Sequence, residues 1–292
     1  MPDHSPVAHA PTTHPHVPYP MRLYRLARLI AHIGYGCFYV GALFPFLSYR
    51  RRLRAIKRWS RHLLAILHVH CTVHGALPRG QQPTLIVCNH VSWLDIWVID
   101  AVLPVRFVAK SDVRRWPVIG FLVSRAGTIF VERQKRHDTA RTNRAIVQAL
   151  ARGEYVAVFP EGTTTDGSEV RPYHASLFQP ALGAGARVVV AALHYRNRDG
   201  SLNLDAHYEG ERSLVESLRL ILAHRRLDVE LIFAGTVDVH GKTRRRIAQE
   251  AEVITSDALG LPRPRRKHGT AGGPRAGLPK APSPKHNLYP AQ

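Results

Sequence analysis

Acidic residues are nearly absent from both ends of this 292-residue chain. Residues 1–94 contain one acidic residue and 11 lysines and arginines, and residues 261–292 contain no acidic residue and 7 lysines and arginines. Residues 95–260, by contrast, contain 20 acidic residues and 23 lysines and arginines. The formal net charge of +20 is therefore carried mainly by the two ends, with a nearly neutral body between them. This asymmetry predicts a globular domain that is attracted to an anionic partner.

Cysteine is also scarce, and an apolar leader is missing. The three cysteines, Cys37, Cys71 and Cys88, are odd in number and lack the spacing of a metal site, which argues against a disulfide framework and fits a reducing compartment. Residues 1–20 are rich in proline and histidine without the apolar run of a signal peptide, and residues 261–292 are basic and rich in proline and glycine. We predict that both segments are disordered tails.

Residues 21–72 are predicted to form two membrane-anchoring helices. Residues 29–49 carry no charged side chain, but this run contains three glycines and a proline, which makes it a poor spanning helix. A second helix, with leucines on one side and basic residues on the other, follows as far as Leu67. The two helices would meet near Pro45 and lie in one leaflet as a membrane-associated helical hairpin, with the arginines on anionic lipid phosphates.

Besides the hairpin, the same basic segment is compatible with two other structures. Residues 29–49 could form a single membrane span, or a helix buried in the core with the arginines on a solvated face. Nucleic-acid binding would also account for the charge, but no recognisable reader motif is present, so we expect no nucleic-acid partner. With an anionic membrane surface as the partner, the expected location is the cytoplasmic face of the inner membrane.

Past Gly75, short apolar runs alternate with amphipathic segments. The runs have the character of buried strands, the segments between them that of helices, and Gly153 predicts the end of one helix. This alternation predicts an α/β domain over residues 73–260, with a largely parallel central sheet flanked by helices and a ligand site at the carboxyl ends of its strands. The predicted strands are 84–88, 105–109, 128–131, 155–159, 188–193 and 228–233, and the predicted helices are 94–102, 117–125 and 139–152.

A histidine and an aspartate follow the first of these strands, in the segment NHVSWLD. On one continuous helix His90 and Asp95 would lie about 140° apart, so they can meet only if His90 lies in the turn and the helix begins at Ser92. The pair Ser92 and Asp95 also resembles a capping box, in which Asp95 would merely cap the helix. The functional alternative is a catalytic pair, in which Asp95 fixes the tautomer of His90 and the imidazole removes a proton from a substrate hydroxyl.

Two further motifs follow predicted strands. In residues 159–165 (FPEGTTT), Gly162 permits close backbone approach, and amides and threonine hydroxyls can bind an oxyanion, although the segment could be a simple turn. In residues 127–133 (GTIFVER), a strand would deliver Arg133, whose guanidinium suits a phosphate unless it pairs with Glu132. Each signal is weak alone, but their common placement at strand ends favours a single site.

In this order, H-x4-D after a strand, G-x-I-F-V-x-R and F-P-E-G-T resemble the first three sequence blocks of the glycerolipid acyltransferases. Within that family, the motifs are similar to those of the bacterial 1-acyl-sn-glycerol-3-phosphate acyltransferases. Residues 107–110 (FVAK) and 116–120 (WPVIG) resemble the family's stretch between the first two blocks. The resemblance covers about residues 75–195.

The resemblance implies transfer of a fatty acyl group from a thioester, acyl-CoA or acyl carrier protein, to the sn-2 hydroxyl of lysophosphatidic acid, which gives phosphatidic acid. It implies that His90 is the general base and Asp95 its partner. It also implies that Arg133 and the turn formed by Glu161, Gly162 and Thr163 hold the acceptor's glycerol phosphate. Because like charges repel, we expect Glu161 to order the loop or to bond the glycerol rather than to touch the phosphate.

Neither a metal ion nor a further cofactor is expected. No G-x-S-x-G motif is present, and Cys88 and His90 are two residues apart in extended or turning backbone, so we expect direct attack by the acceptor hydroxyl without a covalent acyl-enzyme. Backbone amides near Gly162 or Lys110 are candidate donors to the oxyanion, and Lys110 is also a candidate substrate-binding residue.

The chain departs from the family pattern at two positions. Thr164 stands where an arginine often follows F-P-E-G-T, and Val190 aligns with the usual proline of the fourth block. The first departure favours an alternative acceptor, lyso-ornithine lipid or another lysolipid without a phosphomonoester. A non-enzymatic lipid-binding protein of the membrane surface and a hydrolase are further alternatives.

Overall fold

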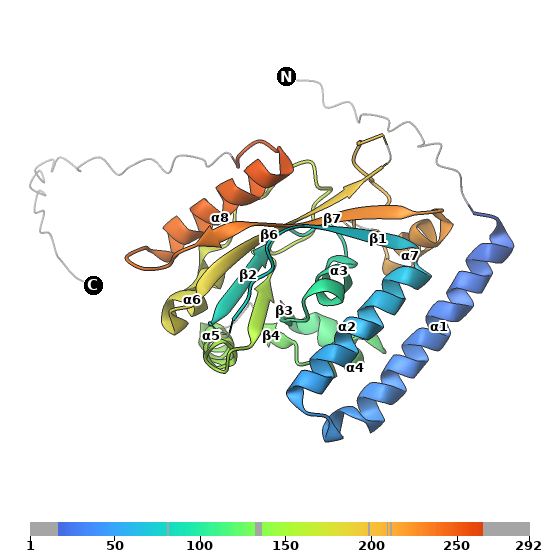
Figure 1. The fold of residues 1–292 in the computed structure, drawn as a ribbon, viewed down its shortest axis with the longest axis horizontal. Helices are drawn as coiled ribbons and strands as arrows, with labels where there is room; N and C mark the ends of the chain where they lie inside the picture. Colours follow the sequence, from blue (N-terminus) through green and yellow to red (C-terminus); the bar gives the residue numbers. More distant parts are fainter. Residues whose placement is uncertain are drawn as a thin grey trace, which may run out of the picture.

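The computed structural model describes residues 17–80, 82–131, 136–197, 199–208, 210 and 212–264, which form a seven-stranded sheet between two layers of helices (Figure 1). The strand order is β1-β7-β6-β2-β5-β3-β4. The last five strands in this order are parallel, whereas β7 is antiparallel to β6 and parallel to β1. The predicted α/β fold with a largely parallel sheet is confirmed. The strands are β1 (Val69–Gly75), β2 (Thr84–Cys88), β3 (Arg106–Lys110), β4 (Ile129–Val131), β5 (Tyr155–Val158), β6 (Arg187–Arg196) and β7 (Leu227–Val237).

The side-chain alternation along β2 divides the core into two layers. Leu85 and Val87 pack with residues of α5, α6 and α8 on one face of the sheet, and Ile86 and Cys88 pack with residues of α2 and α3 on the other. All five residues of β2 are buried, as expected for a central parallel strand. The helices are α1 (Tyr19–Ala42), α2 (Tyr49–Ile66), α3 (Asp95–Val102), α4 (Ile119–Ala126), α5 (Arg136–Ala151), α6 (Gln179–Ala184), α7 (Leu214–Ala223) and α8 (Arg244–Leu259).

All predicted strands and helices are present, but one strand escaped prediction. Strand β1 begins at Val69, inside the segment 21–72 that the sequence suggested for the anchor. As an edge strand that pairs only with β7, it is largely exposed, and its mixed sequence VHCTVHG lacks the continuous apolar run of the central strands. Strand β6 has a register shift against β7 between Val190 and Ala191, at the position where the family resemblance expects proline.

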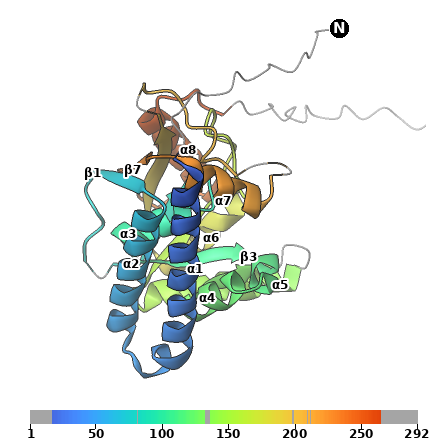
Figure 2. The ribbon, with the colours of Figure 1, turned by 90° about the vertical axis from the view of Figure 1, so that its right-hand side faces the viewer.

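Helices α1 and α2 form an antiparallel hairpin that turns through a short 3-10 helix around Pro45, as predicted (Figure 2). His32 and Trp59 join the two helices. Their rings stack at 4.6 Å, His32 Nε2 lies 3.0 Å from the Trp59 carbonyl oxygen, and Trp59 Nε1 donates to the His32 carbonyl oxygen at 3.3 Å. Gly36 permits this close packing, since a Cβ atom at this position would lie 2.5 Å from Trp59 Nε1.

The hairpin is part of the folded body, which corrects the expectation of an appended membrane-anchoring unit. Leu29 of α1 and Leu63 of α2 are buried in the same cluster as Ile86 of the central strand. Of the alternatives for residues 29–49, the membrane span is not supported, because none of the helices described is long and apolar enough to cross a bilayer. The prediction of a helix buried in the core holds for the inner face of α1. The outer face of α1 carries exposed apolar side chains such as Phe38.

The boundaries of the two predicted tails differ from the structure. Val17, within the predicted tail 1–20, is buried, and its N–H donates to the Ala223 carbonyl oxygen at 2.9 Å. At the other end, the Leu261 N–H donates to the Ser256 carbonyl oxygen, also at 2.9 Å. The remainder of both predicted tails, 1–16 and 265–292, lies outside the described residues.

Candidate active site

The predicted site residues follow strands whose carboxyl ends lie at one edge of the sheet. His90 lies two residues past β2, the turn from Glu161 to Thr163 follows β5, and Lys110 is the last residue of β3. Arg133, expected past β4, lies outside the described residues. The parallel arrangement therefore places the described candidates at the edge where open α/β sheets bind ligands.

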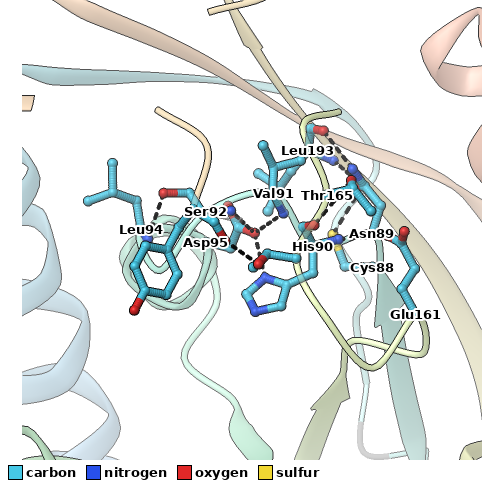
Figure 3. A network of polar contacts seen from close by, with 12 residues as sticks. Cys88, Asn89, His90, Val91, Ser92, Leu94, Asp95, Glu161, Thr165 and Leu193 are labelled. Atoms are coloured by element: carbon cyan, nitrogen blue, oxygen red, sulfur yellow. Dashed lines mark hydrogen bonds and ion pairs between the residues drawn. The ribbon is translucent and has the colours of Figure 1, made fainter. Parts of the chain in front are cut away.

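His90 and Asp95 are in direct contact, as the sequence predicts. His90 Nδ1 lies 2.8 Å from Asp95 Oδ2, and the same oxygen accepts from the backbone N–H of Val91 at 2.8 Å and of Ser92 at 3.0 Å (Figure 3). These bonds hold residues 90–92 as a turn, and α3 begins at Asp95, one residue after the predicted helix 94–102 and three after the start at Ser92. Asp95 thus braces the turn and pairs with the imidazole, whereas the capping interpretation is wrong, because the N-cap residue of α3 is Leu94 and no side chain among the described residues caps the helix.

Tyr195 of β6 completes the environment of Asp95. Its hydroxyl donates to Asp95 Oδ1 at 2.7 Å, and both side chains are buried. Burial and the neighbouring Asp95 carboxylate raise the pKa of Tyr195 well above its ordinary value, so the hydroxyl stays a donor. Tyr195 was not among the predicted site residues, because the predicted strand ended at residue 193. The sequence does contain a signal for this contact: Tyr195 directly extends a strand of buried residues, and a buried tyrosine hydroxyl needs a polar partner.

The His90 ring is held flat against Phe159. The two ring centroids are 4.0 Å apart with planes 11° from parallel, and Phe159 in turn stacks on Phe107 at 5.9 Å. Because a carboxylate can only accept, the Asp95 contact places the proton of neutral His90 on Nδ1. The lone pair is then on Nε2, for which no partner occurs within the described part of the chain, and the side chain is 20% exposed. The site therefore holds an imidazole ready to accept a proton.

Glu161 braces the loop that carries His90. Its Oε1 accepts from the His90 N–H at 2.9 Å and its Oε2 from the Arg171 N–H at 3.0 Å, while burial raises its pKa to about 7. The Thr165 N–H donates to the His90 carbonyl oxygen at 2.8 Å. The turn after β5 thus makes hydrogen bonds to both the N–H and the carbonyl oxygen of His90. This agrees with the expectation that Glu161 orders the loop.

The rest of the turn after β5 is more open. Gly162 has φ +75°, which favours glycine, and its N–H donates to the Phe159 carbonyl oxygen at 3.1 Å, so this amide already serves the turn and is a poor candidate for the oxyanion donor. Thr163 is exposed, and the Thr164 hydroxyl donates to the Tyr208 carbonyl oxygen. Lys110, on the neighbouring strand, is exposed.

A cavity of about 430 Å³ lies between the hairpin and the sheet. Its walls come from α1, α2, α3 and α4 and are mostly apolar, with Trp59, Trp97 and Leu122 among them. Phe107 belongs to the wall and connects the cavity, through Phe159, to the His90 ring. The cavity can hold a long apolar group, and the stacked rings of Phe107 and Phe159 lie between it and the imidazole.

The nearby thiol has the wrong environment for a nucleophile. Cys88 is completely buried in the core, and burial, together with the Asp95 and Glu161 carboxylates, raises its pKa well above the ordinary value. A thiolate is the reactive form of cysteine, so Cys88 is a packing residue rather than a partner of His90.

Comparison with known proteins supports the resemblance seen in the motifs. A family model described as Acyltransferase matches residues 69–194. The chain is 35% identical over 247 residues to the lyso-ornithine lipid O-acyltransferase of Pseudomonas aeruginosa, covering 81% of this chain and 93% of that protein. It is 36% identical over 187 residues to the 1-acyl-sn-glycerol-3-phosphate acyltransferase of Neisseria meningitidis serogroup B, covering 64% of this chain and 73% of that protein.

A solved structure has the same fold. The crystal structure of the 1-acyl-sn-glycerophosphate acyltransferase PlsC from Thermotoga maritima superposes with a TM-score of 0.62 at 19% identity, covering 82% of this chain and 94% of that one. The sequence relatives extend this agreement from fold to enzyme class. The chain belongs to the glycerolipid acyltransferase family and is an acyltransferase of the lysophospholipid type.

Proposed function

We propose that this enzyme transfers a fatty acyl group from a thioester to the sn-2 hydroxyl of 1-acyl-sn-glycerol-3-phosphate, with His90 as the general base. The observation that carries the proposal is the 2.8 Å contact between His90 Nδ1 and the buried Asp95 carboxylate. The donor is acyl-CoA or acyl carrier protein, and the reaction uses no metal ion and no other cofactor.

The chemistry needs one proton acceptor. Nε2 of His90 takes the proton of the acceptor hydroxyl, and the alkoxide oxygen forms a bond to the thioester carbonyl carbon. The resulting imidazolium is stabilised by the Asp95 carboxylate. When the tetrahedral intermediate collapses, the carbon–sulfur bond breaks, and the imidazolium returns the proton to the departing thiolate. The new ester and a free thiol are the products, and His90 is neutral again.

The apolar cavity is the proposed site of the donor's acyl chain. A thioester carrier is water-soluble, so its acyl chain must find an apolar environment in the protein, whereas the tail of a lysolipid can stay in the bilayer. Because the rings of Phe107 and Phe159 lie between the cavity and His90, the thioester end of the chain would have to pass these rings to reach the imidazole.

The acceptor can be identified through Arg133. With 1-acyl-sn-glycerol-3-phosphate, Arg133→Ala should lower kcat/KM by about 10- to 100-fold, because a guanidinium–phosphate contact is lost. With lyso-ornithine lipid, which has no phosphomonoester, the same variant should change kcat/KM less than about threefold. Steady-state rates with both acceptors measure the two effects, and Arg245→Ala, at an exposed arginine of α8, is the matched control. Equal losses with both acceptors would contradict a phosphate-binding role.

Lyso-ornithine lipid is the second candidate acceptor, and Thr164 favours it. The Thr164 hydroxyl bonds to the Tyr208 carbonyl oxygen, so this position supplies no positive charge to the site. The relative from Pseudomonas aeruginosa, which covers most of this chain, is named for that acceptor. Faster turnover of lyso-ornithine lipid than of 1-acyl-sn-glycerol-3-phosphate by the unmodified enzyme would replace the first candidate by the second.

The proposed place of action is the cytoplasmic face of the inner membrane, with the outer face of the hairpin in one leaflet. Ile30, Phe38 and Phe46 are 61%, 68% and 85% exposed, although each is strongly apolar. Exposed arginines follow on α2, where they can contact anionic lipid phosphates. These features fit a helical pair that lies in the interface rather than one that crosses the bilayer.

Replacing Ile30, Phe38 and Phe46 together by serine should weaken binding to vesicles of phosphatidylcholine and phosphatidylglycerol by about tenfold or more. Thermal stability should change little, because the three side chains are exposed in the folded protein. Co-sedimentation measures the binding, and Val215→Ser, at an equally exposed apolar residue of α7, is the matched control. Unchanged sedimentation of the triple variant would place the membrane contact elsewhere.

A further inference from the structure

The cavity that the proposed function assigns to the acyl chain contains a buried carboxyl group. Asp100, in the last turn of α3, is 5% exposed and is one of the residues that line the cavity. Its Oδ1 accepts from the Val105 N–H at 3.1 Å. No other hydrogen bond and no ion pair to Asp100 occurs among the described residues, so the second carboxyl oxygen has no protein partner in that part of the chain.

An acid is an unexpected choice at this position. The carbonyl groups at the end of a helix disfavour a negative charge in its last turn, and no described cation compensates it. Burial raises the pKa of Asp100 to about 8, so at neutral pH the group is mostly protonated and offers an O–H donor as well as an acceptor. The bond to Val105 does not require an acid, since an amide oxygen can accept it equally well. The carboxyl group therefore has hydrogen-bonding capacity that the fold does not use.

We propose that Asp100 is a specificity-determining residue that hydrogen-bonds a hydroxyl group on the acyl chain of the thioester donor. The inference rests on the proposed function, in which that chain occupies the cavity. A chain that carries a hydroxyl at the right carbon satisfies the free carboxyl oxygen, whereas an unsubstituted chain leaves a buried polar group unpaired. Sites built to bind a substrate hydroxyl discriminate strongly against analogues that lack it.

The position of Asp100 on α3 limits which carbon can carry the hydroxyl. Asp95, at the first position of the helix, holds the His90 imidazole, and Asp100 lies five residues later, about 7.5 Å along the helix axis. The recognised hydroxyl is therefore several carbons away from the thioester carbonyl. On α3 and β3 the neighbours of Asp100 in the lining are apolar, namely Ile96, Trp97 and Val105, so Asp100 is the polar group that these two elements supply to the cavity.

The test is a series of acyl thioesters of equal length, either unsubstituted or with one hydroxyl at successive carbons, given to the full-length enzyme with one acceptor. The quantity measured is the ratio of kcat/KM for each hydroxylated donor to kcat/KM for the unsubstituted one. In the unmodified enzyme we expect a ratio of about ten or more at one position or two adjacent positions. Asp100→Leu should bring this ratio to about one or below, and Asp100→Asn should retain most of it, since an amide can bond both the hydroxyl and the Val105 N–H.

Because each ratio is measured on one protein preparation, partial unfolding of a variant cancels. Equal ratios in the unmodified enzyme and in Asp100→Leu at every hydroxyl position would overturn the inference and leave Asp100 as a support for the Val105 backbone. A failure to transfer any acyl group, hydroxylated or not, would overturn the proposed function itself. The two failures are therefore distinguishable.

Discussion

Replacing His90 by alanine should lower kcat/KM for acyl transfer by a factor of about 10³ while the protein stays folded. Among the described residues, the imidazole is the group placed to take the hydroxyl proton at this site, since its Nδ1 faces Asp95 and its Nε2 has no partner there. The fold should survive because the variant keeps the backbone bonds of residue 90 to Glu161 and Thr165 and loses only the side-chain contacts with Asp95 and Phe159.

Single-turnover and steady-state assays with a labelled thioester would measure the effect of His90→Ala, and a thermal melt would establish that the variant is folded. His174→Ala is the matched control, because His174 follows the same loop, is exposed, and contacts Pro160 through its backbone only. A rate for His90→Ala within tenfold of the unmodified enzyme would remove the general-base mechanism. An acyl adduct on the protein, detected by mass spectrometry, would favour the hydrolase-like alternative with a covalent intermediate.

The pairing of His90 with Asp95 was predictable as one of two alternatives, the other being a capping box of Ser92 and Asp95. Two side chains five residues apart cannot meet on a continuous helix, so the contact required a turn before the helix. The central strands were predictable for a similar reason, since a run such as TLIVC is buried on both faces of a parallel sheet. In both cases the local sequence carries the information that decides the structure.

Tyr195 and the start of α3 depend on contacts that the local sequence does not contain. Tyr195 meets Asp95 across 100 residues of chain, and only the register of β6 beside β2 brings them together. The helix starts at Asp95 rather than Ser92 because the Asp95 carboxylate accepts hydrogen bonds from the N–H groups of both Val91 and Ser92. These bonds hold Val91 and Ser92 outside the helix. Such long-range and reciprocal contacts follow from the assembled fold.

The amino-terminal hairpin shows why charge and hydropathy alone mislead. Its apolar run suggested contact with lipid, yet one side of each helix is buried in the core through residues such as Leu29 and Leu63. A helix with apolar residues on much of its surface can face the core with one side and present the rest outward. The sequence shows how many apolar residues are present, but which of them are covered is decided by the packing of α1 on α2, α4 and α7 and of α2 on α3.

Two substitutions of Asp95 should separate its electrostatic role from its structural one. In Asp95→Asn, the amide oxygen can replace Oδ2 toward His90, Val91 and Ser92, and the amide N–H₂ can donate to the Tyr195 hydroxyl oxygen. The fold should therefore be retained. The imidazolium formed during proton transfer loses its neighbouring negative charge, and kcat should fall by about 10²- to 10⁴-fold.

Asp95→Ala should cost both activity and stability. It leaves two buried backbone N–H groups and the Tyr195 hydroxyl without their acceptor, and each orphaned group costs about 1–3 kcal/mol, so the free energy of unfolding should fall by about 3–9 kcal/mol. Tyr195→Phe removes one of these contacts and should cost only about 1 kcal/mol, with a small effect on kcat. Urea denaturation combined with acyl-transfer rates measures all three variants. If Asp95→Asn were as active as the unmodified enzyme, the carboxylate would be a loop brace alone, and the charge that stabilises the imidazolium would have to come from another residue.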